Sequence, residues 1–143
     1  MAAGAWTFTN TTRQKFLNGT FVIPAGSTLK MALFTSGSNL STASTTFAGC
    51  TSEEGTTNTG YTAGGSSVAL TQSGTTTVTV VMTTAPVWTA GSANLTAKWA
   101  AIYVVAGDVI AFALLDSGGA DVTATSGNTF TVGSNGGTVM TLA

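Results

Sequence analysis

The sequence has no histidine, one cysteine, Cys50, and few charged residues. The absence of histidine removes the usual general base, the Ser–His and Cys–His catalytic pairs and the commonest zinc ligand. A single cysteine allows no internal disulfide, and Cys50 has no basic or metal-binding neighbour in sequence that would activate its thiol. These absences point away from most enzyme classes and from a disulfide scaffold.

Charge is the scarcest property of the chain. Lys, Arg, Asp and Glu make up 6% of the 143 residues, against about 25% in an ordinary soluble domain. Four cationic side chains are too few to follow a phosphate backbone, so we expect no nucleic-acid partner. No apolar run reaches the length of about 18 residues that a membrane helix needs, and MAAGAWTFTN is not a secretory signal. A surface with so little charge is poorly protected against association, which suggests that copies of the chain or a partner cover much of it.

The acidic residues do not form a pattern typical of catalysis or of metal binding. Glu53 and Glu54 are adjacent, so in an extended segment they point to opposite sides. Asp108 and Asp121 lie in or beside Gly-containing turns and Asp116 ends a predicted strand, where aspartate commonly bonds its own backbone. We therefore predict no enzymatic activity, no catalytic residue, no metal site and no cofactor.

Residues 95–116, LTAKWAAIYVVAGDVIAFALLD, form the most apolar part of the chain. Apolar residues occur at both parities of the first arm, which predicts a strand buried on both faces, and Gly107 lies at a reversal between two such arms. Further short strands with Gly-rich turns between them bring the predicted total to between eight and ten. These strands are expected at residues 20–23, 29–34, 68–70, 75–83, 129–132 and 138–142. The pattern predicts an all-β protein, an antiparallel β-sandwich of jelly-roll or Ig-like type.

Two other segments complete the predicted organisation. Residues 1–9 are expected to form an extended N-terminal arm and residues 10–143 a single β-sandwich domain. One short helix is predicted over residues 12–18, with Thr11 and Gln14 as a capping box, Phe16 and Leu17 facing the core, and Gly19 ending it. Residues 35–65 are polar and too long for a plain loop, so we expect a surface excursion that a partner orders, or a loop with short edge strands.

The aromatic residues are the best candidates for contact with a partner. Trp99 and Tyr103 are expected in the core, whereas Trp88, next to Pro86 at a strand end, is expected to be exposed. A sugar-stacking platform that uses Trp88 or Tyr61 is an alternative use of the same side chains. The predicted interface residues are Trp6, Phe8, Phe47, Tyr61 and Trp88.

Three blocks, LKMALFTS, GYTAGG and the segment from Trp88 to Asp116, together resemble the small all-β virion proteins of tailed bacteriophages. The resemblance extends from about Thr12 to Leu142 and is carried by patterns of a β scaffold. It implies a structural protein of the virion that is assembled in the cytoplasm of the bacterial host. The commonest such role is a capsid decoration or cement protein, often a trimer, whose partners are the major capsid protein and copies of itself. A tail or tail-fibre component and a carbohydrate-binding β-sandwich module remain alternatives.

Overall fold

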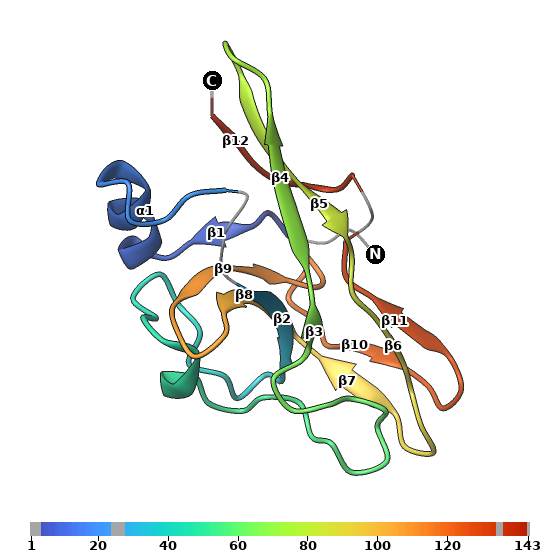
Figure 1. Cartoon of the computed structure of the whole chain (residues 1–143). Helices are drawn as coiled ribbons and strands as arrows, with labels where there is room; N and C mark the ends of the chain where they lie inside the picture. The colour runs from blue at the N-terminus through green and yellow to red at the C-terminus, as the bar shows by residue number, and fades with distance from the viewer. Residues whose placement is uncertain (1–3, 24–27, 134–135, 143) are drawn as a thin grey trace.

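The computed structural model describes residues 4–23, 28–133 and 136–142 of the chain. These residues form mostly β structure in several antiparallel sheets, with one short helix near the N-terminus (Figure 1). The predicted all-β class and the predicted helix are confirmed at this level. The strands are β1 (Thr7–Phe8), β2 (Leu29–Phe34), β3 (Ser66–Ser67), β4 (Ala69–Ser73), β5 (Val78–Thr84), β6 (Val87–Thr89), β7 (Leu95–Ala97), β8 (Trp99–Val104), β9 (Val109–Leu114), β10 (Val122–Ala124), β11 (Thr129–Thr131) and β12 (Thr138–Leu142).

The central hairpin consists of β8 and β9 and is confirmed. The two strands pair antiparallel, and the reversal between them places Ala106 at φ 59°. Both faces of the hairpin are covered, as the two-faced apolar pattern predicted: Ile102 and Ala111 belong to one core cluster, and Ala101 and Phe112 to a second on the opposite face. The hairpin is therefore the shared wall of two hydrophobic cores.

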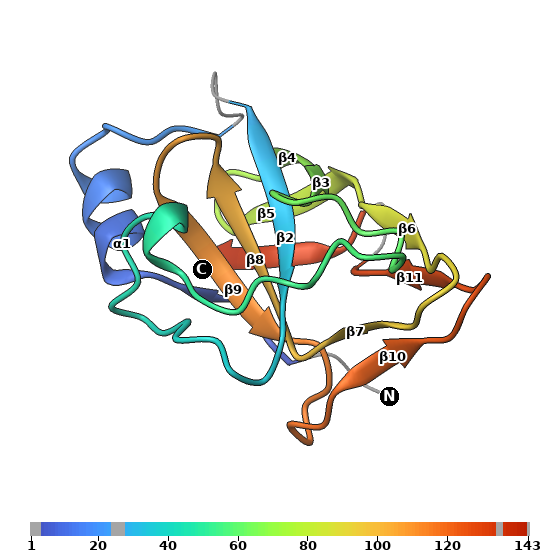
Figure 2. The same ribbon diagram turned by 90° about the horizontal axis from the view of Figure 1, so that it is seen from below.

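The hairpin lies in the middle of a five-stranded sheet with the order β1-β9-β8-β2-β3. Figure 2 shows β2, β8 and β9 side by side, with the helix beyond the β9 side of the sheet. A second sheet has the order β12-β5-β4, and two smaller sheets pair β10 with β7 and β11 with β6. Only Val68 separates β3 from β4, and Figure 1 shows these strands running on as one nearly straight segment from the first sheet into the second.

The β12-β5-β4 sheet covers the larger core. The antiparallel register puts Val80 opposite Met140 and Met82 opposite Leu70, so these side chains share one face. Val80 and Met82 are fully buried, which confirms the inward positions predicted from the alternation in this strand. The last strand was also predicted correctly, because β12 spans Thr138–Leu142.

The helix α1 spans Asn10–Leu17, and its start differs from the prediction. The N-cap is Thr9, whose side-chain oxygen accepts a hydrogen bond from the Thr12 backbone N–H, so the predicted capping box at Thr11 is wrong. Gly19 follows the C-cap residue at φ +73°, as predicted, because a left-handed residue after a helix is least costly for glycine. Leu17 is 91% exposed instead of facing the core. Phe16 takes the inward position, and the next residue on a helix is turned about 100° away from it.

Residues 20–23 form no strand, so that prediction is also wrong; they run irregularly from α1 toward the core, where Ile23 is buried. The sequence PAGS at residues 24–27 predicts a turn, and these residues lie outside the described part of the chain. Residues 35–65 form turns, one 3-10 helix (Phe47–Gly49) and isolated bridges that pair Phe34 with Glu53 and Thr46 with Asp108. The long polar segment is therefore held by contacts within the chain itself.

Candidate interaction surface

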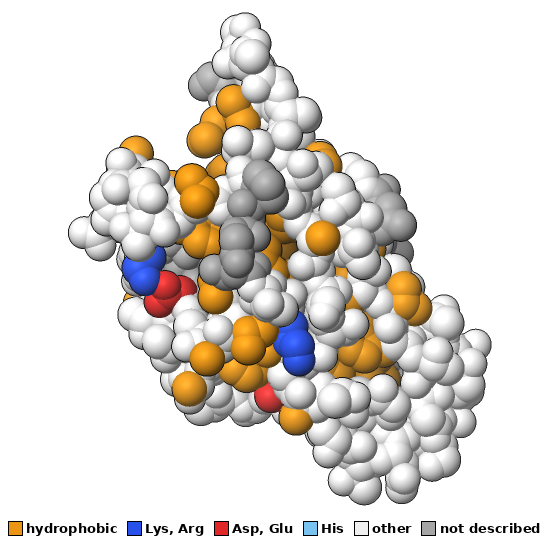
Figure 3. Space-filling view, in the orientation of Figure 1, with side chains coloured by type: hydrophobic (Ala, Val, Ile, Leu, Met, Phe, Trp, Pro, Cys, Tyr) orange, Lys and Arg blue, Asp and Glu red, His pale blue; other side chains and the backbone are white. Residues whose placement is uncertain are grey.

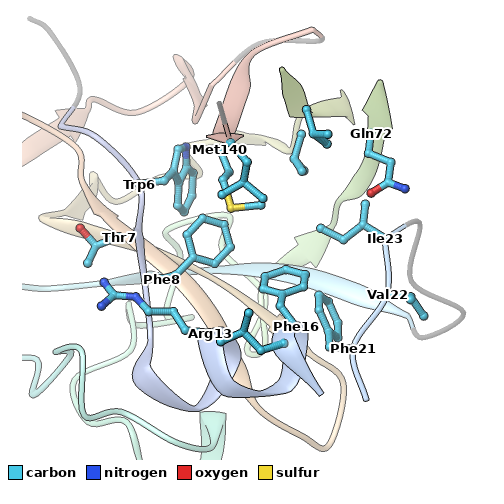
Figure 4. Close-up of a pocket in the computed structure, with 14 residues that line it drawn as sticks. Trp6, Thr7, Phe8, Arg13, Phe16, Phe21, Val22, Ile23, Gln72 and Met140 are labelled. Carbon is cyan, nitrogen blue, oxygen red and sulfur yellow. The ribbon is translucent and has the colours of Figure 1, made fainter. Parts of the chain in front are cut away.

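An apolar groove of about 730 Å³ opens between α1 and the β12-β5-β4 sheet. Figure 4 shows aromatic side chains from β1, from α1 and from the segment after it pointing into this groove, with Met140 opposite them. The groove is lined by Trp6, Thr7, Phe8, Arg13, Phe16, Leu17, Phe21, Val22, Ile23, Gln72, Val78, Val80, Met140 and Leu142.

The wall on the helix side is a chain of aromatic contacts. The ring centroids of Phe8 and Phe16 lie 5.8 Å apart, and those of Phe16 and Phe21 lie 5.0 Å apart in an edge-to-face arrangement. Such pairs add stability beyond the area that they bury. The wall is therefore packed from side chains on three successive segments of the chain.

Two polar contacts fix α1 in this position. Thr9 Oγ1 lies 2.8 Å from the carbonyl oxygen of Val109, so the N-cap residue also ties the helix to β9. Lys15 forms an ion pair with Asp108 in the turn between β8 and β9. The helix is thus attached to the central hairpin at its N-cap and near its last turn.

The opposite wall is the end of the β12-β5-β4 sheet that extends beyond the body of the molecule (Figure 1). Leu142 pairs with Val78, and both share a face with Met140 and Val80, which are nearer the core. Val80 is buried, whereas Leu142 at the projecting end is 57% exposed. The groove is therefore a continuation of the larger core that this chain leaves open to solvent.

Three of the five large apolar side chains that are exposed in the described residues, Leu17, Val22 and Leu142, line this groove. The other two, Val87 and Val105, lie elsewhere and do not join it. Apolar side chains scattered singly are ordinary on a protein surface, but a contiguous apolar patch with a polar rim is typical of an interaction site. The concentration at one groove makes it the best candidate surface of the molecule.

Among the described residues that line the groove, Arg13 is the one that carries a charge. Its side chain is exposed, and the ion pair found within residues 4–23, 28–133 and 136–142 joins Lys15 to Asp108 and does not involve it. In Figure 4 the guanidinium group lies at one end of the groove, beside Thr7. Figure 3 shows that charged atoms are few on this face and that apolar patches lie among uncharged polar atoms.

A smaller hollow of about 490 Å³ adjoins the groove. It runs between residues 4–8 and β12, and Trp6, Phe8 and Met140 line both this hollow and the larger groove. The groove and this hollow are therefore adjacent.

Of the five predicted interface residues, two line the groove and three lie elsewhere. Trp6 and Phe8 are half-buried and line the groove, whereas Phe47 packs elsewhere, its ring stacked on that of Tyr103 with centroids 3.9 Å apart. Trp88 is 5% exposed and Tyr61 is 3% exposed, so the expected exposure of Trp88 is wrong. Trp88 alternates in β6 with the exposed Val87 and Thr89 and is paired with the buried Phe130 of β11, which turns the indole inward.

The carboxylates Glu53 and Glu54 hold the long polar segment in place. Glu53 Oε1 accepts hydrogen bonds from the Tyr61 hydroxyl and from the Gly64 backbone N–H, each at 2.6 Å. Burial, followed by the hydrogen bond to Glu53, raises the pKa of Tyr61 above its usual value. Glu54 accepts from the Thr96 backbone N–H, and burial raises its pKa. The two side chains have separate partners, as their adjacency in an extended segment predicted, and their contacts are those of a structural clamp.

No group of three or more metal-ligating side chains is present in the described ranges. In the same residues, no helix is both long and apolar enough to cross a membrane.

Arg13, Phe21, Met140 and Leu142 line the groove but were not predicted as site residues. These residues form one surface because the segment that contains α1 lies near β12 in the folded chain. Short sequence patterns do not predict such contacts between distant segments.

Comparisons with protein-family models, with curated proteins and with solved structures found no match.

Proposed function

We propose that this chain is a non-enzymatic structural protein of a tailed-bacteriophage virion. Within the virion, it acts as a decoration or cement protein that binds and stabilises the outer capsid lattice. The observation that carries the proposal is the apolar groove between α1 and the β12-β5-β4 sheet, in a chain with so few charges. The resemblance of its LKMALFTS, GYTAGG and 88–116 blocks to small phage virion proteins supplies the setting.

The groove fits the chemistry of a stable interface. The fully buried centre of a protein interface is apolar and rich in aromatic residues, with arginine enriched and other charges depleted. Trp6, Phe8, Phe16 and Phe21 with Arg13 at one end match that composition. A partner that covered this surface would remove Leu17, Val22 and Leu142 from water, which is the source of binding free energy that this surface offers.

A cement protein of this kind stabilises a lattice by contacting neighbouring capsid subunits at once. Dissociation of one subunit from the lattice then requires loss of these added contacts as well. The major capsid protein and other copies of this chain are the proposed partners, in a trimer or another homo-oligomer.

We also infer that the two larger sheets form the layers of a β-sandwich of jelly-roll or Ig-like type. The support is a shared core: Met31 and Ile102 from the five-stranded sheet and Val80 and Met82 from the β12-β5-β4 sheet belong to one hydrophobic cluster.

The test of the proposed role is the copy number of this chain relative to the major capsid protein in purified particles, measured by mass spectrometry. We expect close to one copy for each capsid subunit, hundreds in all. A few copies, or a few dozen, would instead place the chain in the tail or a tail fibre. Complete absence from the particles would overturn the virion proposal.

The carbohydrate-binding alternative has less support. Trp88 and Tyr61, the side chains suggested for sugar stacking, are buried within the chain. Stacking on a sugar requires an exposed aromatic face, so a glycan should leave the tryptophan fluorescence of the protein unchanged.

A further inference from the structure

The two larger sheets form one series of seven antiparallel strands that ends on each side in an unpaired edge. Counting the nearly continuous β3 and β4 as one strand, the order is β1-β9-β8-β2-β3/β4-β5-β12. Every pairing along this series is antiparallel. Because direction alternates along seven strands, the two end strands β1 and β12 run in the same direction.

An odd number of alternating strands cannot close into a continuous antiparallel sheet. An eighth strand that ran opposite to both β1 and β12 would pair antiparallel with each of them. Figure 1 shows β1 and β12 both running from the right of the view toward the left, with a separation between them. Within the described ranges, no hydrogen bond joins these two strands. We call the space between them the seam.

The free edge of β1 presents backbone groups to the seam. The Thr9 N–H donates to the carbonyl oxygen of Ile110 on β9. Backbone groups of successive residues in an antiparallel strand point alternately toward the neighbour and away from it, so the N–H and C=O of Phe8 point away from β9. β12 likewise pairs only with β5 among the residues that the structure describes. Neither edge strand contains a lysine or a proline, two of the usual protections against pairing with another chain.

The flanks of the seam suit the side chains of an incoming strand. The groove of about 730 Å³ and the hollow of about 490 Å³ adjoin each other here, and Trp6, Phe8 and Met140 line both. A peptide that adds to a sheet edge places alternate side chains on one face, and apolar pockets on that face then determine which sequence binds.

The charge of Arg13 adds a further requirement on the incoming strand. Arg13 lies at one end of the groove without an ion-pair partner in the described part of the chain. Of the carboxylates, Glu53, Glu54, Asp108 and Asp116 already accept hydrogen bonds within the chain. A partner strand with an acidic residue at that end would complement Arg13.

A second copy that exchanged β1 would replace one strand with an identical one and leave each copy with seven. A strand from a different protein would supply an eighth, and an acidic residue in that strand would pair with Arg13.

We propose that the seam between β1 and β12 binds one extended segment of the capsid subunit, with apolar side chains at alternate positions and an acidic side chain beside Arg13. This inference rests on the proposed function and describes how the protein would bind the capsid subunit. The segment runs antiparallel to β1 and β12 and is held by main-chain hydrogen bonds, by the apolar groove and by Arg13.

Site-directed photocrosslinking tests this proposal. Thr141 is exposed on β12 and lines the hollow, so Thr141→Cys in a Cys50→Ser background carries a benzophenone maleimide at the seam. Thr131→Cys, exposed on β11, is the matched control. After binding to particles stripped of the protein and irradiation, we expect the Thr141 probe to label one short segment of the capsid subunit, and the Thr131 probe not to label it.

Two substitutions of similar exposure test the groove. Leu142 is 57% exposed beside the seam, and Val87 is 54% exposed on β6, away from it. Leu142→Lys should weaken binding to stripped particles at least about tenfold, whereas Val87→Lys should bind as the unmodified chain does. Arg13→Glu should also weaken binding, and Arg13→Lys should restore part of it. Circular dichroism and unfolding curves establish that each variant is folded.

The outcomes separate the two proposals. If the unmodified chain binds particles but the Leu142 and Arg13 variants bind equally well, the seam proposal is wrong and the cement role stands. Crosslinks from Thr141 to a second copy of this chain would overturn the capsid segment as occupant. If the unmodified chain does not bind particles at all, both the cement role and the occupant named here are overturned.

Discussion

Thr9 illustrates how one small polar side chain can position an entire helix. It is fully buried, caps α1 and approaches the carbonyl oxygen of Val109 on β9, so its loss affects both the helix end and the attachment of the helix. We expect Thr9→Val to lower the free energy of unfolding by about 1–2 kcal/mol, because valine has a similar shape but cannot form these hydrogen bonds. Urea unfolding of the variant and of the unmodified chain measures this difference.

Thr11→Ala is the matched control. Thr11 was predicted to cap the helix but lies inside it, one residue before Thr12. We expect this substitution to change the free energy of unfolding by no more than about 0.5 kcal/mol, because it removes no capping hydrogen bond. If Thr11→Ala lowered the free energy of unfolding as much as Thr9→Val, the assignment of Thr9 as the N-cap would be contradicted.

Glu54 makes stability depend on pH in a direction that can be stated in advance. Its pKa is raised from about 4.5, mainly because burial disfavours the ionised form. The folded protein therefore holds this proton more tightly than the unfolded chain does. The stability that protonated Glu54 provides is complete below its unfolded pKa and is lost as the pH rises through its folded pKa.

Glu54→Gln should remove this dependence, because glutamine keeps an oxygen that accepts from Thr96 and cannot ionise. We expect the variant to gain stability relative to the unmodified chain as the pH rises above about 4.5, since only the unmodified chain must ionise a buried group. Urea unfolding at a series of pH values gives the comparison. A difference that stays constant over this range would show that Glu54 does not titrate differently in the folded state.

At the scale of single residues, sequence patterns predicted those positions whose neighbours are close in the chain. The inward alternation of Val80 and Met82 follows from one strand alone, and it is correct. The burial of Trp88 depends on its pairing with Phe130, 42 residues away in a separate strand, so its position beside Pro86 was misleading. Leu17 was misplaced because Phe16 and Leu17 cannot both face the core of so short a helix.

Among the elements, the segment of residues 35–65 depends most on individual contacts. Glu53 accepts two hydrogen bonds from within the segment, from the Tyr61 hydroxyl and the Gly64 N–H, and Tyr103 on β8 donates its hydroxyl to the carbonyl of Gly64. Gly65, at φ +68°, lets the chain pass directly against β2, where a Cβ atom would lie 1.8 Å from the carbonyl oxygen of Met31. The segment is therefore locked to the five-stranded sheet by its own polar network.

Glu53→Ala should release this segment without unfolding the sheet. We expect a loss of about 2 kcal/mol in the free energy of unfolding, because the Tyr61 hydroxyl and the Gly64 N–H would lose their acceptor. Hydrogen exchange should become faster over residues 53–65 and stay unchanged in β8 and β9. Glu53→Gln, which keeps an acceptor oxygen, is the control, and equal exchange in the two variants would contradict the clamp.

The elements also differ in how well the sequence predicted them. The β8–β9 hairpin joins neighbouring segments, so its apolar arms and the reversal at Gly107 were sufficient to predict it. The edges of the seam are set by pairings between distant segments: β1 with β9, about 100 residues apart, and β5 with β12, about 60 residues apart. The sequence predicted strands at β5, β9 and β12 and an extended arm that contains β1, but the position of the unpaired edges follows only from the complete strand order.

At the scale of the whole molecule, the scarcity of charge determines how binding should respond to salt. The groove contains one charged side chain, Arg13, and the chain carries nine formal charges in total. Salt at about 0.5 M shortens the Debye length to a few ångströms and screens exposed charge pairs, but it does not weaken apolar contacts or main-chain hydrogen bonds. We therefore expect the protein to stay on purified particles when NaCl is raised from about 0.1 to 0.5 M, with at most a modest loss from the Arg13 pair. Sedimentation of particles followed by quantitative mass spectrometry of the pellet measures the retained fraction. Release of most copies by salt alone would mean that the contact is electrostatic and involves a surface other than this groove.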